Sequence, residues 1–291
     1  MEYYVCIDIG GTAIKYGLVN RNGEFIDKAS MPTEANLGGI GIVAKIKNII
    51  MEYSKVQKLT GVAISTAGVI DYTDGSIKFA LAIPNYTGTK LKEIIEEDFK
   101  LKCAVENDVN CIALGEMWLG AGKGKSSLFC MALGTSIGGC AVFDKKVIHG
   151  ASNSAGEIAY MLIPGGNMHE LVSTTRLVKD VANAKNLAVD EVNGKKIFVW
   201  AKQDDEISKN AIYRLMEHLA DGIVNITSVF NPEMIILGGG IMAQTEYLQP
   251  IITQILKEKL QPNVYEKTEI AFAKLENDAG MLGALYNLLY C

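Results

Sequence analysis

One pattern of secondary structure occurs twice in this 291-residue chain, and its two copies lie about 125 residues apart. Each copy predicts an apolar strand that ends in a glycine–threonine turn, then a second strand, a polar turn and a third strand. The first copy covers residues 3–29, with its third strand at 24–29. The second covers residues 128–149, with its third strand at 147–149. Duplication of one domain explains the repeat most simply, so we expect two related α/β domains.

The segments around the two copies predict alternating helices and strands. We expect a small N-terminal domain at residues 1–117 and a larger C-terminal domain at 118–279, with the last helix, 280–291, returning to the N-terminal domain. Further helices are predicted at 40–53, 91–99 and 109–119 and through much of 170–231, and further strands at 59–65, 103–106 and 233–237.

Composition excludes several classes of function. Acidic residues outnumber basic ones 33 to 28, a balance that argues against binding nucleic acid or an acidic membrane surface. No apolar run approaches the ~20 residues of a membrane-spanning helix, and the N-terminal segment does not match a signal peptide. The six cysteines mostly lie in apolar runs without a CxxC pair, which predicts buried free thiols. We expect a cytoplasmic protein.

The glycines are numerous, 29 against 6 prolines, and several of them follow predicted strands. Taken one at a time, such glycines indicate only tight hairpin turns. Three clusters at strand ends instead favour turns whose backbone N–H groups contact a ligand. Neither a GxxxxGK[ST] loop nor a GxGxxG turn that opens a helix is present. The clusters lie at residues 10–11, at 134 and 138–139, and at 238–240.

These clusters carry a resemblance to a known family. Residues 8–12, Asp-Ile-Gly-Gly-Thr, together with Lys15, resemble the first phosphate motif of the actin-like ATPase fold. Residues 133–139 resemble the second phosphate motif, and residues 235–240 resemble the motif that packs under the adenosine. With Glu-Asn-Asp-Val-Asn at 106–110 and Ala-Gly-Glu at 155–157, the set resembles the ROK family of sugar kinases and related repressors across nearly the whole chain.

The resemblance implies an actin-like ATPase (ribonuclease H-like) fold, with two duplicated α/β domains around a cleft. It further implies transfer of phosphate from ATP to a hydroxyl of a hexose or hexoside, with C6 as the expected position. Asp8 would also help to hold Mg²⁺. From the residues alone, the alternatives are that Asp8 caps the glycine turn and that Lys15 is a surface charge of a strand. The implied nucleotide-binding residues are Asp8, Gly10, Gly11, Thr12, Lys15, Gly134, Thr135, Gly138, Gly238, Gly239 and Gly240.

On the acceptor side, the resemblance makes Asp108 the general base that takes the proton of the sugar hydroxyl. Without the resemblance, Asp108 would be interpreted as the N-cap of the following helix. Asn107 is expected to hydrogen-bond neighbouring sugar hydroxyls. The implied sugar-binding residues are Gly68, Asn85, Asn107, Asp108, Glu157, Tyr160 and Glu170.

The chain departs from the family at its zinc loop. The family pattern has Glu-x-Gly-His followed by three cysteines, whereas this chain has Glu-Ile-Ala-Tyr at 157–160 and no cysteine in 161–170. One histidine, His169, cannot complete a four-ligand zinc site, so we expect no structural zinc. Tyr160 either offers its hydroxyl to the sugar or packs in the core. The departure is similar to the β-glucoside kinase branch, but N-acetylmannosamine kinases and glucokinases remain alternatives.

Two other classes of protein share this core. A kinase-dead sugar sensor or binding protein stays possible because Ser136 stands where a glycine is common. A repressor is not expected, since the first phosphate motif begins at Asp8 and leaves no room for a DNA-binding helix pair before it. Use of ATP rather than GTP and assembly as a homodimer follow from the resemblance.

Overall fold

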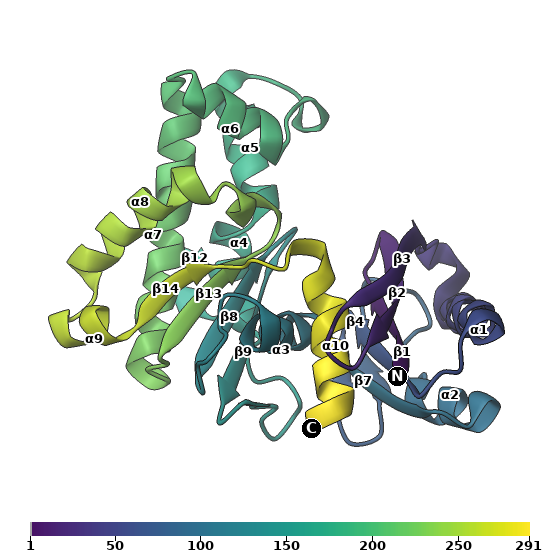
Figure 1. Cartoon of the computed structure of the whole chain (residues 1–291). Helices are drawn as coiled ribbons and strands as arrows, with labels where there is room; N and C mark the ends of the chain where they lie inside the picture. The colour runs from purple at the N-terminus through teal and green to yellow at the C-terminus, as the bar shows by residue number, and fades with distance from the viewer. Residues whose placement is uncertain (1) are drawn as a thin grey trace. The chain divides into compact units, whose positions relative to one another are not determined.

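The computed structural model describes residues 2–291, which divide into two compact units (Figure 1). The first unit comprises the residues up to 124, 141–155 and 277–291, and the second comprises 125–140 and 156–276. The chain therefore passes between the units four times. Within the described residues, no helix is long and apolar enough to cross a membrane.

The first sheet has the strand order β3-β2-β1-β4-β7. Strands β1, β2 and β3 form an antiparallel meander, and β4 and β7 run parallel to β1. The predicted third strand is present but extends beyond residue 29 to Pro32. The strands of this sheet are β1 (Tyr3–Ile9), β2 (Ala13–Asn20), β3 (Phe25–Pro32), β4 (Gly61–Thr66) and β7 (Lys102–Asn107). A separate hairpin consists of β5 (Val69–Asp71) and β6 (Ser76–Phe79).

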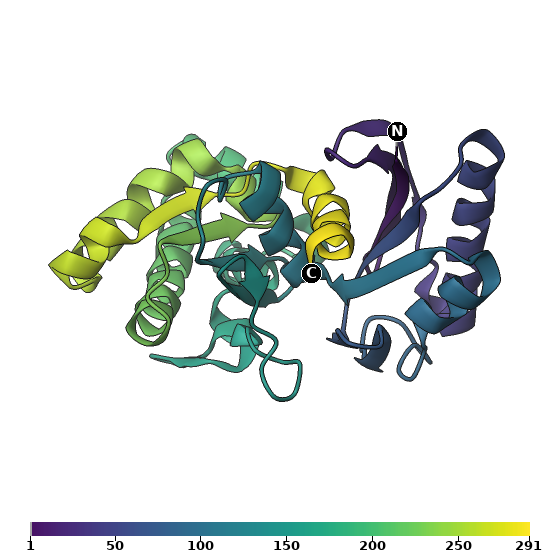
Figure 2. The same ribbon diagram turned by 60° about the horizontal axis from the view of Figure 1, so that its bottom comes forward.

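Helices cover both faces of this sheet. Helix α1 (Gly38–Val56) lies on one face, while α3 (Asp108–Leu119) and α10 (Ala279–Tyr290) lie on the other (Figures 1 and 2). The isoleucines of α1 recur at helical spacing and are buried against the sheet, as the hydrophobic periodicity predicts. Helix α2 (Leu91–Phe99) precedes β7.

Helices α3 and α10 approach each other closely because glycines face the contact. A Cβ added to Gly115 would lie 2.4 Å from the carbonyl oxygen of Ala279. A Cβ added to Gly283 would lie 1.6 Å from the carbonyl oxygen of Cys111. Any side chain at either position would therefore collide with backbone. This contact joins the C-terminal helix to the first unit.

The second sheet repeats the topology of the first, with the order β10-β9-β8-β13-β14. Strand β13 pairs in parallel with β8 and with β14, as β4 pairs with β1 and β7. The two matching orders confirm the expected duplicated α/β fold. The third strand of this copy was expected at 147–149 but is β10 (Lys146–Val147), and the chain then leaves the sheet. The other strands are β8 (Leu128–Leu133), β9 (Ile137–Phe143), β13 (Met234–Gly238) and β14 (Glu269–Phe272).

Several helices of the second unit begin at strong capping residues. The side chains of Ser173, Asn193 and Asp205 accept hydrogen bonds from first-turn N–H groups of α5, α6 and α7 respectively. The segment expected as a loop at 161–170 contains the short strands β11 (Leu162–Ile163) and β12 (Gly166–Asn167) and begins α4. The helices are α4 (Met168–Leu171), α5 (Thr174–Lys185), α6 (Gly194–Lys202), α7 (Glu206–Val229), α8 (Thr245–Lys259) and α9 (Pro262–Lys267).

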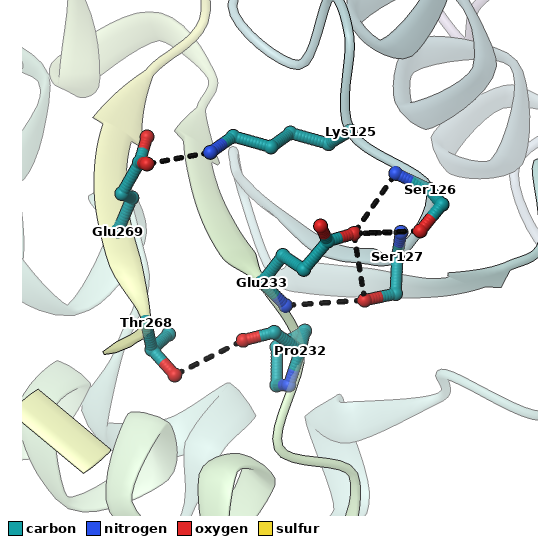
Figure 3. Close-up of polar contacts among 7 residues, drawn as sticks. All are labelled: Lys125, Ser126, Ser127, Pro232, Glu233, Thr268 and Glu269. Carbon is teal, nitrogen blue, oxygen red and sulfur yellow. Dashed lines mark hydrogen bonds and ion pairs between the residues drawn. The ribbon is translucent and has the colours of Figure 1, made fainter. Parts of the chain in front are cut away.

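A single carboxylate joins the starts of β8 and β13 (Figure 3). One oxygen of Glu233 accepts hydrogen bonds from the backbone N–H groups of Ser126 and Ser127, at 2.9 and 2.8 Å, and from both serine hydroxyls. These donors lower the pKa of Glu233 to about 2, so the carboxylate stays charged at neutral pH. Beside it, Lys125 pairs with Glu269 at the start of β14.

Candidate active site

The first glycine turn joins β1 to β2 and is held in place by hydrogen bonds. The N–H of Gly10 donates to the carbonyl oxygen of Ala13 at 3.1 Å, which closes the turn. Thr33, which follows β3, donates its hydroxyl to the Gly10 carbonyl at 2.6 Å and its N–H to the Thr12 carbonyl at 2.9 Å. Gly11 and Thr12 remain exposed. The turn thus presents backbone and a hydroxyl group on a fixed support.

Asp8 and Lys15 are directly opposite each other in the β1–β2 ladder. One carboxylate oxygen of Asp8 accepts the Ser65 hydroxyl at 2.7 Å, and the other lies 3.7 Å from the Lys15 ammonium. Lys15 also donates to the Asn277 side chain at 2.9 Å. Within residues 2–291 the carboxylate of Asp8 accepts no N–H of the glycine turn, so it is not a turn cap, and Lys15 is not an isolated surface charge.

The surroundings of Asp8 are compatible with its carboxylate acting as a ligand of a phosphate-bound Mg²⁺. Its side chain is only 18% exposed, and burial raises its pKa while Ser65 and Lys15 lower it. A Cβ on Gly280, in the first turn of α10, would lie 2.8 Å from the carboxyl carbon, so space beside Asp8 depends on that glycine. Carboxylate oxygen is the ligand type that Mg²⁺ prefers. The donor chemistry of Asp8 therefore fits Mg²⁺.

The turn from β7 into α3 is organised by Asn107. Its side-chain oxygen accepts the N–H groups of Val109 at 2.9 Å and Asn110 at 3.1 Å, which makes Asn107 the N-cap. Its amide nitrogen donates to the Gly68 carbonyl at 2.9 Å and to an Asp108 carboxylate oxygen at 3.0 Å. The alternative that Asp108 caps the helix is thus wrong. All four hydrogen bonds of the Asn107 amide are used, so a sugar contact would have to replace one of them.

Asp108 is the first residue of α3 and is partly buried. The oxygen that accepts from Asn107 also accepts the N–H of Val109 at 2.9 Å. Asp8 is paired with Ser65 and Ser65 with Glu106 across the parallel strands β1, β4 and β7. The carboxyl ends of these strands therefore share one edge, which carries Asp8, the first glycine turn and Asp108.

Gly68 and Asn85 lie in loops of the same unit. Gly68 has a φ of 118°, and a Cβ there would lie 2.7 Å from the Phe79 carbonyl, so only glycine fits. Its own carbonyl receives Asn107. Asn85 is exposed, with a φ of 52°, beside the buried Tyr86, whose hydroxyl pairs with Thr66 at 3.1 Å. The structure places Gly68 in contact with the Asn107 turn and leaves Asn85 at the surface.

The second glycine turn joins β8 to β9 and is tied to the start of α5. The Thr174 N–H donates to the Gly134 carbonyl at 2.9 Å, and the Thr175 hydroxyl donates to the Thr135 carbonyl at 3.0 Å. Gly134 and Thr135 are exposed. The hydroxyl of Ser136 lies 2.7 Å from Nδ1 of His169. A serine therefore stands where the family usually has a glycine, and its hydroxyl has a specific partner, His169.

The third cluster follows β13. Gly239 has a φ of 102°, and a Cβ there would lie 2.0 Å from the Leu133 carbonyl, so the backbones of β8 and this turn are in contact. A Cβ on Gly240 would have no atom within 4 Å. Gly238 ends the strand and is buried. Gly239 is needed for packing, whereas Gly240 faces open space that a ligand can use.

The proposed sugar-binding residues of the second unit lie around a short 3₁₀ turn. Glu157 precedes the turn, and Tyr160 ends it with 74% of its surface exposed. The alternative that Tyr160 packs in the core is therefore wrong. Glu170 is also exposed, and its carbonyl accepts a hydrogen bond of 3.3 Å from Arg176. All six cysteines are free, with only Cys291 exposed.

The sequence model of the ROK family matches residues 4–289. The chain belongs to the ROK family. An uncharacterized protein of Clostridium perfringens is 46% identical to it, over 99% of this chain and 98% of the relative. A beta-glucoside kinase of Listeria innocua is 33% identical, over 97% and 96% respectively. The structure of a ROK family glucokinase from Streptomyces griseus, in complex with glucose and AMPPNP, has a TM-score of 0.84 at 27% identity, covering 97% of this chain and 98% of that one.

Family membership and the two matching sheets establish the actin-like ATPase fold for this ROK protein. Motif reasoning missed two of its polar contacts. His149 pairs with Glu106, and His169 pairs with Ser136. Both histidines belong to segments without a motif, and their partners are 43 and 33 residues away in sequence. Only the tertiary fold brings these residues together.

Proposed function

We propose that this ROK protein is a kinase that transfers phosphate from ATP to a hydroxyl of a hexose or hexoside, at C6. One observation carries the proposal. Asp108 is held at the edge of the first sheet that also bears Asp8 and the first glycine turn. The relatives support it, since they include a beta-glucoside kinase and a glucokinase bound to glucose and AMPPNP.

In this mechanism Asp108 accepts the proton of the acceptor hydroxyl as that oxygen attacks phosphorus. The hydrogen bonds from Asn107 and Val109 fix the carboxylate, so its orientation costs nothing at the moment of reaction. When bound, MgATP supplies the phosphoryl group and a cation that neutralises developing charge. Asp8 would hold the ion, and Lys15, Thr12 and the backbone N–H groups of the glycine turns would bind phosphate oxygens.

Polar groups of several loops are the candidates for sugar binding. We assign Glu157, Tyr160 and Glu170 in the second unit to contacts with sugar hydroxyls, because the side chains of all three are exposed within residues 157–170. In the first unit, Asn85 and the backbone of Gly68 are assigned to the same task. Asn107 acts chiefly by orienting Asp108. A cytoplasmic homodimer completes the proposal.

The test is an ADP-release assay with MgATP and a panel of acceptors. Glucose, fructose, N-acetylmannosamine, cellobiose and aryl β-glucosides separate the three candidate substrate classes. We expect sugar-dependent ADP release that the Asp108→Asn variant loses. If the protein binds nucleotide and sugar but turns over no acceptor, a sugar sensor is favoured. The reason for this alternative is Ser136, which stands in the second phosphate motif where a glycine is common.

We predict that the purified protein holds no stoichiometric zinc. The loop at 161–170 offers one histidine and no cysteine, while a structural zinc site needs four ligands. Elemental analysis after expression in zinc-supplemented medium should find far less than one zinc per chain, and treatment with a chelator should leave the unfolding midpoint unchanged. A tightly held zinc that survives gel filtration at one per chain would contradict the prediction.

A further inference from the structure

A buried carboxylate accepts hydrogen bonds from the turn between β7 and α3, which carries the proposed base Asp108. Glu106, the last residue but one of β7, has a side chain only 2% exposed. One of its oxygens accepts the N–H of Asn107 at 2.7 Å and the side-chain amide of Asn110 at 2.9 Å. The other lies 2.7 Å from Nε2 of His149. Glu106 thus joins the backbone and side chains around Asp108 to a histidine from another part of the chain.

His149 is itself enclosed. Its side chain is 16% exposed, and the ring of Tyr72 stacks on it with centroids 3.9 Å apart and an angle of 11° between the planes. Tyr72 comes from the β5–β6 hairpin, and His149 from the segment after β10, where the chain leaves the sheet. All of these residues belong to the first unit. Two segments that are far apart in sequence therefore come together to place one shielded ring nitrogen against Glu106.

We propose that His149 is a positioning residue for the Asp108 base and acts through Glu106 and Asn107. This inference rests on the proposed function of Asp108. A buried carboxylate is costly unless its oxygens are paired, so removal of the His149 donor forces Glu106 to move or admit water. Each of these responses changes the acceptor of the Asn107 N–H.

The effect reaches Asp108 because Asn107 has no spare hydrogen bond. Its amide is committed to Gly68, Val109, Asn110 and Asp108 at 2.9–3.1 Å, so a shift of its backbone is passed to the Asp108 carboxylate. Proton transfer and in-line attack are sensitive to small displacements, and a shift of about 1 Å can cost ~10²-fold in rate. We therefore expect the network to affect kcat more than substrate binding.

The first experiment compares His149→Leu with His149→Gln. Leucine removes the donor, and we expect kcat to fall ~10–100-fold with little change in KM for ATP. Glutamine carries an Nε2 that can donate to Glu106, so it should recover most of the lost rate. His218→Leu, the same change at a histidine of the second unit outside this network, is the matched control and should keep kcat. Equal kcat for the wild type and His149→Leu would overturn the proposal.

A double-mutant cycle with Asp108→Asn separates positioning from general damage. If His149 acts through Asp108, His149→Leu should change the residual rate of Asp108→Asn less than ~3-fold. An equal loss in both backgrounds would make His149 merely structural and overturn the inference. Full activity of Asp108→Asn alone would instead overturn the proposed base, so the two failures are distinguishable.

A second variant covers the case in which His149→Leu does not fold. Glu106→Gln keeps the shape of the side chain, and its oxygen can still accept from Asn107 and Asn110. Its amide can donate to Nε2 of His149 once the ring carries its proton on Nδ1. The charge-assisted hydrogen bonds of the carboxylate become weaker neutral ones, so Asn107 is held less firmly. We therefore expect a folded protein with kcat reduced ~10-fold and the same dependence on Asp108 in the cycle. Wild-type kcat for Glu106→Gln together with unfolded His149→Leu would count against the proposal.

Discussion

Replacement of Asp108 by asparagine is expected to lower kcat by about 10²–10⁴-fold while sugar binding is largely retained. The amide has the shape of the carboxylate, and its oxygen can still accept from Asn107 and Val109. It cannot take up the proton of the acceptor hydroxyl. The rate is measured by ADP release, and sugar binding is measured by calorimetry with the acceptor that the panel identifies.

The control for this variant is Asp190→Asn, the same change at an exposed residue of the second unit. It should leave kcat and binding at wild-type values. A normal turnover rate for Asp108→Asn would show that the base is another group. Loss of sugar binding in step with turnover would move Asp108 from proton transfer to substrate binding.

The second large effect is expected from Gly283→Ala. The added methyl group would lie 1.6 Å from the Cys111 carbonyl oxygen, and helix backbone cannot yield as a flexible side chain does. Helices α3 and α10 would have to separate, which opens the packing behind β1 and β4. We expect the midpoint of thermal unfolding to fall by roughly 10 °C, or the protein to become insoluble.

Gly240→Ala provides the matched comparison for stability. Its added methyl group would have no atom within 4 Å, so the unfolding midpoint in the absence of ligands should change by less than about 2 °C. Circular dichroism or calorimetry of both variants tests the difference. Equal midpoints for the two alanine variants would show that α3 and α10 can adjust without cost.

Local patterns predicted much of the fold. The hairpin at Asn20–Gly23 is a short-range signal, and its Asn20 side chain accepts the N–H groups of Asn22 and Glu24 as turn chemistry requires. Glycines at strand ends marked both glycine turns. The α3–α10 contact could not be predicted in this way, because Gly115 and Gly283 lie inside apolar helices where a glycine has no periodic signature. Strand β10 ends at Val147, two residues before His149, whose pairing with Glu106 is a tertiary contact.

The residue types of the candidate site could be predicted from the sequence, but the role of each residue could be predicted less well. Asn107 and Asp108 are both good N-cap residues, and a helix boundary uncertain by one residue leaves the choice open. Hydrogen-bond geometry makes Asn107 the N-cap and Asp108 the first residue of the helix. Tyr160 lies in a segment without periodicity, so its exposure was not readable from its neighbours. Glu106 was part of the motif, but its partner His149 lies 43 residues away.

The four chain crossings also bear on how the protein is made. Helix α10 follows both sheets in sequence, yet it completes the unit that contains the first strand, and it packs against α3 and β4. All residues of the second unit precede it. A growing chain can therefore assemble the second unit while the first still lacks a helix. The N-terminal sheet is expected to reach its native packing only after α10 has emerged from the ribosome.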